Sequence, residues 1–287
     1  MTRSLTVRAT GPLALVQDLG RPGQAGIGVG RSGAADRHSL RQANRAVGNH
    51  EGAAAIEVTL GGLVVEVGDE GVCLCVAGAP GEVSIDGRGA GSHSVLEVPA
   101  GSVVSLGQPR QGLRSYLAVR GGLEVPEVLG SRSRDVMSGL GPEPLAEGDV
   151  LPVGRPVRVH PGVDHLPWPR FTDPVVLRAV RGPRDGWVGE VDLLTTATWR
   201  ATDRSNRVGM RLDGPGLPHA RDEQLPSEGA WRGAIQVPPS GEPVLFLADH
   251  PVTGGYPVVA VVVDQDVDRA AQVRPGQQVS FRWTEAP

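Results

Sequence analysis

Short apolar runs separated by glycine turns recur along the first half of the chain. Strand-like stretches lie within residues 56–77, 94–106 and 115–123, and turns such as Gly61-Gly62 and Gly121-Gly122 lie among them. Short apolar runs bounded by glycine are typical of β-strands. We therefore expect the first half to form a curled sheet.

One segment of the first half has a helical pattern instead. From Asp36 to Val47 the apolar residues recur at helical spacing, and Gly48 can end the helix in the left-handed conformation. Asp36 can cap this helix, because its carboxylate accepts free backbone N–H groups of the first turn. We expect one clear helix here, with Asn44 near the same face as Asp36.

The second half also consists of strand-like runs, and prolines separate it from the first half. The runs lie at 175–180, 243–248, 256–263 and 278–283. Prolines gather among polar residues in 154–174, which is typical of an interdomain linker. With 287 residues, two medium domains are expected. We predict an N-terminal β-barrel-like domain over 1–153, the linker over 154–174 and a C-terminal β-barrel over 175–287.

The composition supports a mainly β chain and excludes several kinds of function. Glycine (41) and proline (25) are abundant and aromatic residues are scarce (3%), which favours many short strands joined by turns. The formal charge is −4 and no basic stripe is present, so we expect no nucleic-acid partner. The chain has no lysine, and all 28 basic residues are arginine. It therefore cannot carry biotin on a lysine, form a Schiff base or supply a P-loop lysine.

Sequence signals for a membrane, a metal or a self-contained enzyme are absent. The longest apolar run, Val258 to Val263, is too short to span a bilayer, and the first twenty residues lack a signal peptide's apolar core. We expect a cytoplasmic protein without a membrane partner. Cys73 and Cys75 lie in one strand-like run and are expected to be core residues, with no metal site. No nucleophile elbow, Walker loop or dinucleotide fingerprint is present.

The first of three polar, glycine-rich segments combines a turn at 16–23 with the helical region. It offers four candidate residues, Gln17, Arg21, Asp36 and Asn44. A carboxylate, amides and a guanidinium brought together in this way could orient a small polar substrate. Structural roles stay equally open, because Arg21 could brace the turn and Asp36 could cap the helix.

The second segment, residues 205–214, contains two arginines around a glycine. Arg207 and Arg211 are four positions apart, so on a strand both would point to one face. Two guanidiniums on one face could bind a single phosphate or carboxylate. The alternative is that both are ordinary exposed surface residues.

The third segment is the densest in polar residues. Glu228, Gln236 and Asp249 lie where apolar strands meet glycine turns, and Thr253-Gly254-Gly255 offers backbone N–H groups that could hold an oxyanion. Tyr256, which follows directly, is one of only two tyrosines. A turn-rich barrel rim would explain the glycines but not this clustering, so we favour a functional site.

Taken in order, these segments resemble a family that includes KipA, the C subunit of 5-oxoprolinase and the second carboxyltransferase half of urea carboxylase, also called allophanate hydrolase subunit 2. The resemblance covers nearly the whole chain. Its most specific matches are Val16–Gly23, Ser32–Asp36, Ala43–Asn49, Ser227–Gly229, Gly233–Pro239 and Thr253–Pro257. The resemblance implies a mainly β fold of two cyclophilin-like β-barrel domains with a few short helices.

Three positions within 205–212 depart from the family's usual pattern: Asn206, Val208 and Met210. Asn206 stands where many relatives have aspartate, while Ser205, Arg207 and Gly209 match. Asparagine removes a negative charge, so we do not place Asn206 among the catalytic residues.

The resemblance implies a subunit of an ATP-dependent 5-oxoprolinase, which opens the lactam of 5-oxoproline to glutamate. It implies two partners, a KipI-like B-type subunit and an A-type subunit of the LamB/YcsF kind, and ATP, with or without Mg, bound by the complex. We expect no activity from the chain alone. The expected catalytic residues are Asp36, Asp249, Gln236 and Glu228. The expected substrate- or phosphate-binding residues are Gln17, Arg21, Asn44, Arg207, Arg211, Thr253, Gly254, Gly255 and Tyr256.

Two other functions stay open. One is a carboxyltransferase component of a biotin-dependent urea or amide carboxylase, which would need biotin on a separate carrier because this chain has no lysine. The other is a KipA-like regulatory protein that binds a KipI-like kinase inhibitor and catalyses nothing.

Overall fold

The computed structural model describes residues 3–156 and 162–285, and the chain divides into two compact units. Unit 1 comprises Met1–Arg21, Ser32–Asp135 and Gly139–Arg170, and unit 2 comprises Pro22–Arg31, Val136–Ser138 and Phe171–Pro287. Two short segments of the N-terminal half therefore group with unit 2. Residues 157–161 of the predicted linker lie outside the described residues, and the predicted domain boundaries stay a prediction.

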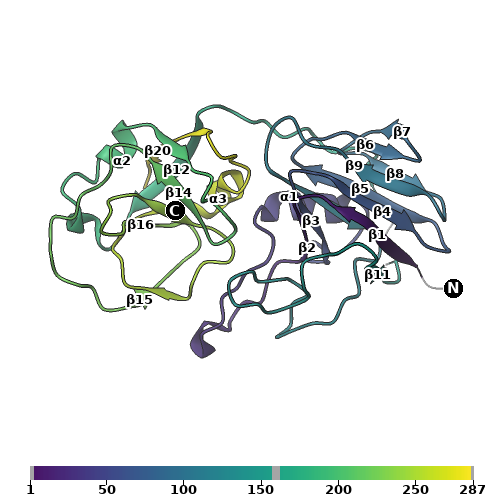
Figure 1. The fold of residues 1–287 in the computed structure, drawn as a ribbon, viewed down its shortest axis with the longest axis horizontal. Helices are drawn as coiled ribbons and strands as arrows, with labels where there is room; N and C mark the ends of the chain where they lie inside the picture. The colour runs from purple at the N-terminus through teal and green to yellow at the C-terminus, as the bar shows by residue number, and fades with distance from the viewer. Residues whose placement is uncertain (1–2, 157–161, 286–287) are drawn as a thin grey trace. The chain divides into compact units, whose positions relative to one another are not determined.

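Unit 1 contains two antiparallel sheets (Figure 1). The first is ordered β11 (Val150–Pro152), β1 (Ser4–Thr10), β4 (Leu63–Val67), β9 (Val103–Leu106), β6 (Val83–Ile85) and β7 (Arg88–Ala90). The second is ordered β2 (Leu13–Gln17), β3 (Ala55–Thr59), β10 (Arg114–Val119), β5 (Val72–Gly78) and β8 (Val95–Val98). Both sheets contribute buried side chains to one apolar core, which includes Leu5 and Val65 from the first sheet and Ile56 and Leu117 from the second.

The helix α1 (Arg37–Ala46) packs on the second sheet and explains why two of its strands are buried on both faces. Strands alternate their side chains between faces, and β4 buries every second residue as a half-exposed strand should. In β5 and β10 every residue is buried. One face joins the core between the sheets, and the other packs against Leu40 and Ala43 of α1. The predicted burial of Cys73 and Cys75 in a strand is confirmed.

The predicted helix and its ends are confirmed. Asp36 is the N-cap, and its carboxylate accepts a hydrogen bond from the Ser39 N–H at 2.9 Å. Gly48 follows the helix with φ of 73°, a left-handed conformation that glycine adopts without steric cost.

Unit 2 is a closed barrel of seven strands with short helices beside it (Figure 1). The strand order is β12 (Val175–Arg181), β19 (Val258–Val262), β16 (Ala234–Gln236), β17 (Val244–Phe246), β14 (Gly209–Asp213), β13 (Trp199–Ala201) and β20 (Gln278–Trp283). The barrel closes through a parallel pairing of β12 with β20. The fully buried ring of Trp199 fills part of its core.

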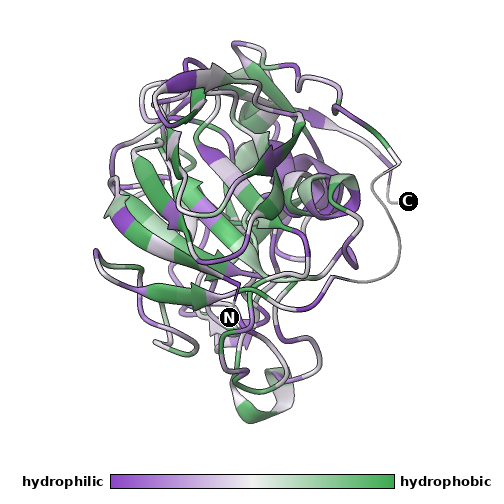
Figure 2. Ribbon diagram, turned by 90° about the vertical axis from the view of Figure 1, so that its right-hand side faces the viewer, coloured by the Kyte–Doolittle hydropathy of each residue, from purple (hydrophilic) through white to green (hydrophobic). Residues whose placement is uncertain are grey.

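Small elements complete unit 2. A two-stranded sheet joins β15 (Glu228–Gly229) to β18 (Thr253–Gly254). The remaining helices are η1 (Ala25–Ile27), η2 (Asp185–Trp187), α2 (Leu193–Thr196) and α3 (Asp264–Ala270). Figure 2 shows hydrophobic residues concentrated along strands. The predicted mainly β fold with a few short helices is confirmed, and no helix among the described residues is long and apolar enough to cross a membrane.

Candidate functional site

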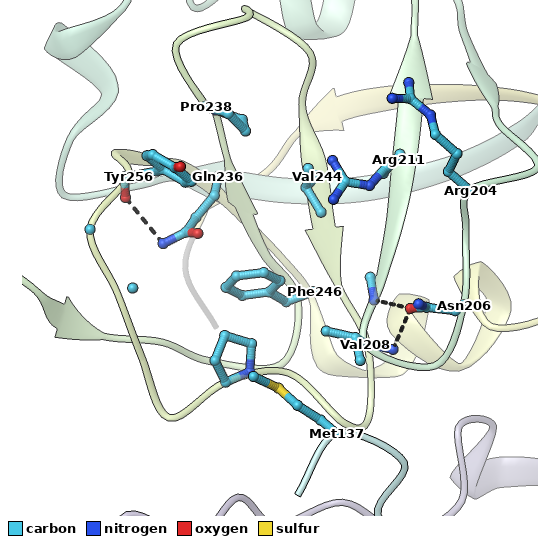
Figure 3. A pocket seen from close by; sticks show the side chains of 14 residues that line it. Met137, Arg204, Asn206, Val208, Arg211, Gln236, Pro238, Val244, Phe246 and Tyr256 are labelled. Carbon is cyan, nitrogen blue, oxygen red and sulfur yellow. Dashed lines mark hydrogen bonds between the residues drawn. The ribbon is translucent and has the colours of Figure 1, made fainter.

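A pocket of about 450 Å³ opens in unit 2, where β14, β16 and β17 meet the turn that carries β18 (Figure 3). Its polar side chains belong to Arg204, Asn206, Arg211, Gln236 and Tyr256. Its other lining residues are Met137, Val208, Gly209, Pro238, Val244, Phe246, Pro251, Gly254 and Gly255. Five predicted site residues line this pocket: Arg211, Gln236, Gly254, Gly255 and Tyr256.

Gln236 is held in place by the glycine turn opposite it. Its side chain is buried, and its Nε2 donates a hydrogen bond to the Tyr256 carbonyl oxygen at 3.1 Å. A Cβ atom on Gly254 would lie 2.6 Å from this nitrogen, so a larger residue there would displace the amide. The glycine turn predicted as an oxyanion site therefore also positions the glutamine side chain.

The arginines Arg207 and Arg211 were predicted to share one strand face, and this prediction was wrong. Strand β14 begins at Gly209, so only Arg211 belongs to it. Arg207 precedes the strand and is buried, while Arg211 is exposed and lines the pocket. The backbone turn between Asn206 and Gly209 places the two guanidiniums in different surroundings.

Arg207 forms a buried, bidentate ion pair with Asp249. The Arg207 Nε and Nη2 donate to the two Asp249 oxygens at 2.8 and 3.0 Å, and both side chains are almost completely buried. Asp249 also accepts a hydrogen bond from the Val136 N–H at 3.1 Å. This bond holds the segment that contains Met137, a residue of the pocket wall. Neither member of the pair is among the pocket-lining residues. The predicted catalytic role of Asp249 and the predicted phosphate-binding role of Arg207 stay predictions.

Glu228 and Thr253, which also belong to the third polar segment, lie on the small sheet beside the pocket. Glu228 pairs with Gly254 across β15 and β18, and its carboxylate accepts hydrogen bonds from the Arg184 Nε at 3.1 and 3.2 Å. These hydrogen bonds lower the pKa of Glu228, which keeps it ionised and makes it a weak proton acceptor. Thr253 is exposed and lies opposite Gly229 in the same sheet.

Two of the predicted residues of unit 1, Asp36 and Asn44, hold the ends of α1. The two Asp36 carboxylate oxygens accept from the Ser39 N–H and from the Ser39 hydroxyl at 2.6 Å. At the other end, the Asn44 Nδ2 donates to the Ala53 carbonyl at 2.8 Å, and its Oδ1 accepts from the Asn49 amide at 3.0 Å. Both residues therefore have structural hydrogen bonds, in line with the structural roles that the sequence left open.

Gln17 and Arg21 are buried and bind the backbone of the segment 128–134. The Gln17 Nε2 donates to the Arg134 carbonyl at 2.8 Å. The Arg21 guanidinium donates to the carbonyls of Val128, at 3.4 Å, and Ser133. These contacts match the bracing role considered for Arg21, and a substrate-binding role for either residue stays a prediction.

The sequence interpretation missed a buried polar network beneath the start of α1. The Tyr116 hydroxyl donates to Glu57 Oε2 at 2.8 Å and accepts the Asp36 N–H at 2.8 Å. Arg114 lies beside the same carboxylate, with its Nε 3.6 Å from Glu57 Oε1. Burial, and then the negative charge of Glu57, raise the pKa of Tyr116 well above its usual value. The available signal was Glu57 between the apolar residues Ile56 and Val58 of β3, and Tyr116 in the strand-like run 115–123.

The apolar wall of the pocket was also missed. Met137 and Phe246 supply much of it, and neither belongs to a polar, glycine-rich pattern. Among residues 3–156 and 162–285, no group of three or more His, Cys, Asp or Glu side chains could hold a metal ion.

Comparison with known proteins gives consistent relatives. The family model for the carboxyltransferase domain, subdomain A and B, matches residues 27–283. The chain is 36% identical to the C subunit of 5-oxoprolinase from Escherichia coli (strain K12), over 96% of this chain and 90% of the relative. It is 33% identical to urea amidolyase of Lachancea kluyveri, over 96% of this chain but 16% of that protein.

A solved structure has the same fold. The crystal structure of TTHA0988 superposes with a TM-score of 0.90 at 35% identity, over 98% of this chain. The chain spans 56% of the length of that protein.

Proposed function

The chain belongs to the carboxyltransferase domain family, and from this premise we propose that it is the C subunit of an ATP-dependent 5-oxoprolinase complex. The observation that carries the proposal is the 36% identity to the C subunit of a 5-oxoprolinase, which extends over 90% of that relative. The complex would open the lactam of 5-oxoproline to glutamate.

The pocket of unit 2 supports this function as a site for a small lactam. Its volume of about 450 Å³ lies within the range of small-molecule sites, about 300–1,000 Å³. An apolar wall, which includes Phe246, faces a rim of arginine and amide groups. A lactam such as 5-oxoproline combines a small ring with an amide and a carboxylate, and these walls offer a contact for each.

Lactam opening requires the loss of amide resonance, and phosphorylation supplies the driving force. In the proposed reaction the lactam carbonyl oxygen attacks the γ-phosphorus of ATP, and ADP leaves. Water then attacks the carbonyl carbon and the C–N bond breaks, which leaves an acyl phosphate on the opened chain. A second water hydrolyses this acyl phosphate to glutamate and phosphate. The pocket arginines suit an anionic group, but the sequence has neither lysine nor a Walker loop. We therefore assign ATP, with or without Mg, to the complex as a whole.

The predicted residues divide into three roles in this proposal. Arg211, Gln236 and Tyr256 contact the substrate, and the turn Thr253–Gly255 stabilises developing oxyanion charge. Arg207 and Asp249 position the pocket wall through their ion pair. The remaining candidates, whose roles in the reaction stay predictions, are Gln17, Arg21, Asp36, Asn44 and Glu228.

The partners in the proposal are a KipI-like B-type subunit and an A-type subunit of the LamB/YcsF kind. The test is ATP-dependent release of glutamate from 5-oxoproline by the three chains together, with each chain omitted in turn. Glutamate release that requires this chain supports the proposal. An inert three-chain complex rejects it and favours the other two functions, a carboxyltransferase component or a regulatory protein that binds a KipI-like kinase inhibitor.

A carboxyltransferase function is the second candidate, because the family model is named for this activity and urea amidolyase is a relative. Biotin would have to reach the pocket on a separate carrier. Bicarbonate-dependent carboxylation of urea or an amide, with such a carrier added, would favour this function.

A further inference from the structure

The charged residues that line the unit 2 pocket are all arginines. Two of its fourteen residues are arginines, Arg204 and Arg211, and none is aspartate or glutamate. Guanidinium groups bind carboxylates and phosphates through charge-assisted hydrogen bonds. The lining therefore favours a ligand with an anionic group at this end.

The two arginines are not equivalent. The Arg204 Nη2 lies 3.1 Å from Glu242 Oε2, so an exposed ion pair already compensates its charge. The Arg211 guanidinium has no ion pair within residues 3–156 and 162–285. Arg211 also lies on a barrel strand, because β14 pairs with β17 at Arg211 and Val244. It is thus the available cation, and its backbone is fixed by the barrel.

Asn206 adds a neutral donor at the same end of the pocket. Its Oδ1 accepts the N–H groups of Val208 at 2.8 Å and Gly209 at 3.2 Å (Figure 3). Because the carboxamide oxygen is occupied in this way, asparagine can offer a ligand the two hydrogens on Nδ2. An anion at this end therefore finds donors from two residues.

The side of the pocket opposite the arginines suits the amide group and the ring of an acidic lactam. Figure 3 shows Gln236 and Tyr256 across the pocket from Arg204 and Arg211, with Phe246 between the two sides. One Gln236 N–H bonds to the Tyr256 carbonyl, and a side-chain amide has a second N–H and an oxygen. A lactam needs one donor and one acceptor in return, and its ring can lie against the Phe246 side chain.

From this arrangement we propose that Arg211 is the specificity-determining residue of the site, which binds the substrate's carboxylate and selects acidic lactams over neutral ones. The inference rests on the proposed function and adds the residue that recognises the substrate's carboxylate. Arg211 is exposed, so solvent weakens its contact relative to a buried pair.

The experiment measures steady-state kinetics of the reconstituted three-chain complex with 5-oxoproline and with its neutral analogue, 5-oxoprolinamide. Arg211→Gln is expected to raise KM for 5-oxoproline about tenfold, as loss of one charge-assisted hydrogen bond predicts, with kcat little changed. It should leave KM for the neutral analogue unchanged. Arg211→Lys, which keeps the charge, should recover part of the loss.

Matched variants control for a general effect of removing arginine. Arg282→Gln, on an exposed position of β20 outside the pocket, should behave as wild type. Arg204→Gln should raise KM less than Arg211→Gln, because Glu242 already compensates Arg204.

Each contrary result has a distinct meaning. If the wild-type complex releases glutamate and Arg211→Gln keeps its KM for 5-oxoproline, the proposed function stands and the role of Arg211 is wrong. An equal loss with both substrates, with a raised KM for ATP, would place phosphate at Arg211 and overturn carboxylate recognition. A wild-type complex without turnover would instead reject the proposed function itself, and this inference with it.

Discussion

Arg207 and Arg211 are four positions apart and of the same type, yet they differ in burial and in ion pairing. Arg207 is buried and bound on two nitrogens by Asp249, whereas Arg211 is exposed in the pocket without an ion pair among the described residues. Local sequence gives both the same pattern. Burial separates them, because a buried guanidinium needs a partner and an exposed one does not.

The buried pair makes a stability prediction. Replacing Arg207 with alanine leaves Asp249 buried without its cation, so the free energy of unfolding should fall by about 3–5 kcal/mol. Urea denaturation followed by circular dichroism measures this change. Arg204→Ala, which removes a pair with both side chains exposed, should cost about 1 kcal/mol or less. Equal losses in the two variants would contradict the structural role of the pair.

Tyr116 makes a prediction about pH. Its pKa is raised above the usual value of 10.0 in the folded chain, so the folded state holds the phenol proton more tightly than the unfolded state does. The resulting stabilisation is complete below pH 10 and is lost as the pH rises through the folded-state pKa. Tyr116→Phe should cost about 1–3 kcal/mol at pH 8. The difference in unfolding free energy between the two proteins should shrink above pH 10, and a constant difference would rule this linkage out.

The helix α1 begins after Asp36, which caps it and for which a catalytic role was also predicted. Asp36 caps the helix through Ser39, and the same carboxylate was predicted to move protons. A cap needs only an acceptor oxygen, which asparagine also has, while proton transfer needs a titratable group. The two roles can therefore be separated by substitution.

Asp36→Asn should keep the free energy of unfolding within about 0.5 kcal/mol of wild type, whereas Asp36→Ala should lower it by about 0.5–2 kcal/mol. Thermal unfolding of both variants tests this. If Asp36 only caps the helix, glutamate release by the complex should survive the asparagine change. A folded Asp36→Asn variant without turnover would support the predicted catalytic role.

At the scale of the whole molecule, the absence of lysine decides how biotin could take part. No lysine is present to be biotinylated, so any biotin in a functional assembly belongs to another chain. The proposed lactam-opening reaction also needs no CO₂ carrier. Excess avidin and removal of bicarbonate should therefore leave glutamate release unchanged. Inhibition by avidin would favour the carboxyltransferase function.

Local sequence patterns predicted many of the strands, the helix α1 and the family, but not strands such as β1 and β2. Apolar runs, glycine turns and one helical repeat predicted those strands and α1, because these patterns depend on local backbone geometry and on which residues are buried. Gln236, Tyr256 and the glycines beside them were also found from local polarity. A set of motifs in order identified the family before any contact was known.

Which residues meet depends on the tertiary fold. Barrel closure assembles a pocket from four strands and turns, and it brings apolar residues such as Met137 and Phe246 to the site, although nothing in their local sequence marks them. The same folding buries Arg207 against Asp249, which lies 42 residues away. Pairing over such distances depends on strand order and register, and local patterns do not encode these.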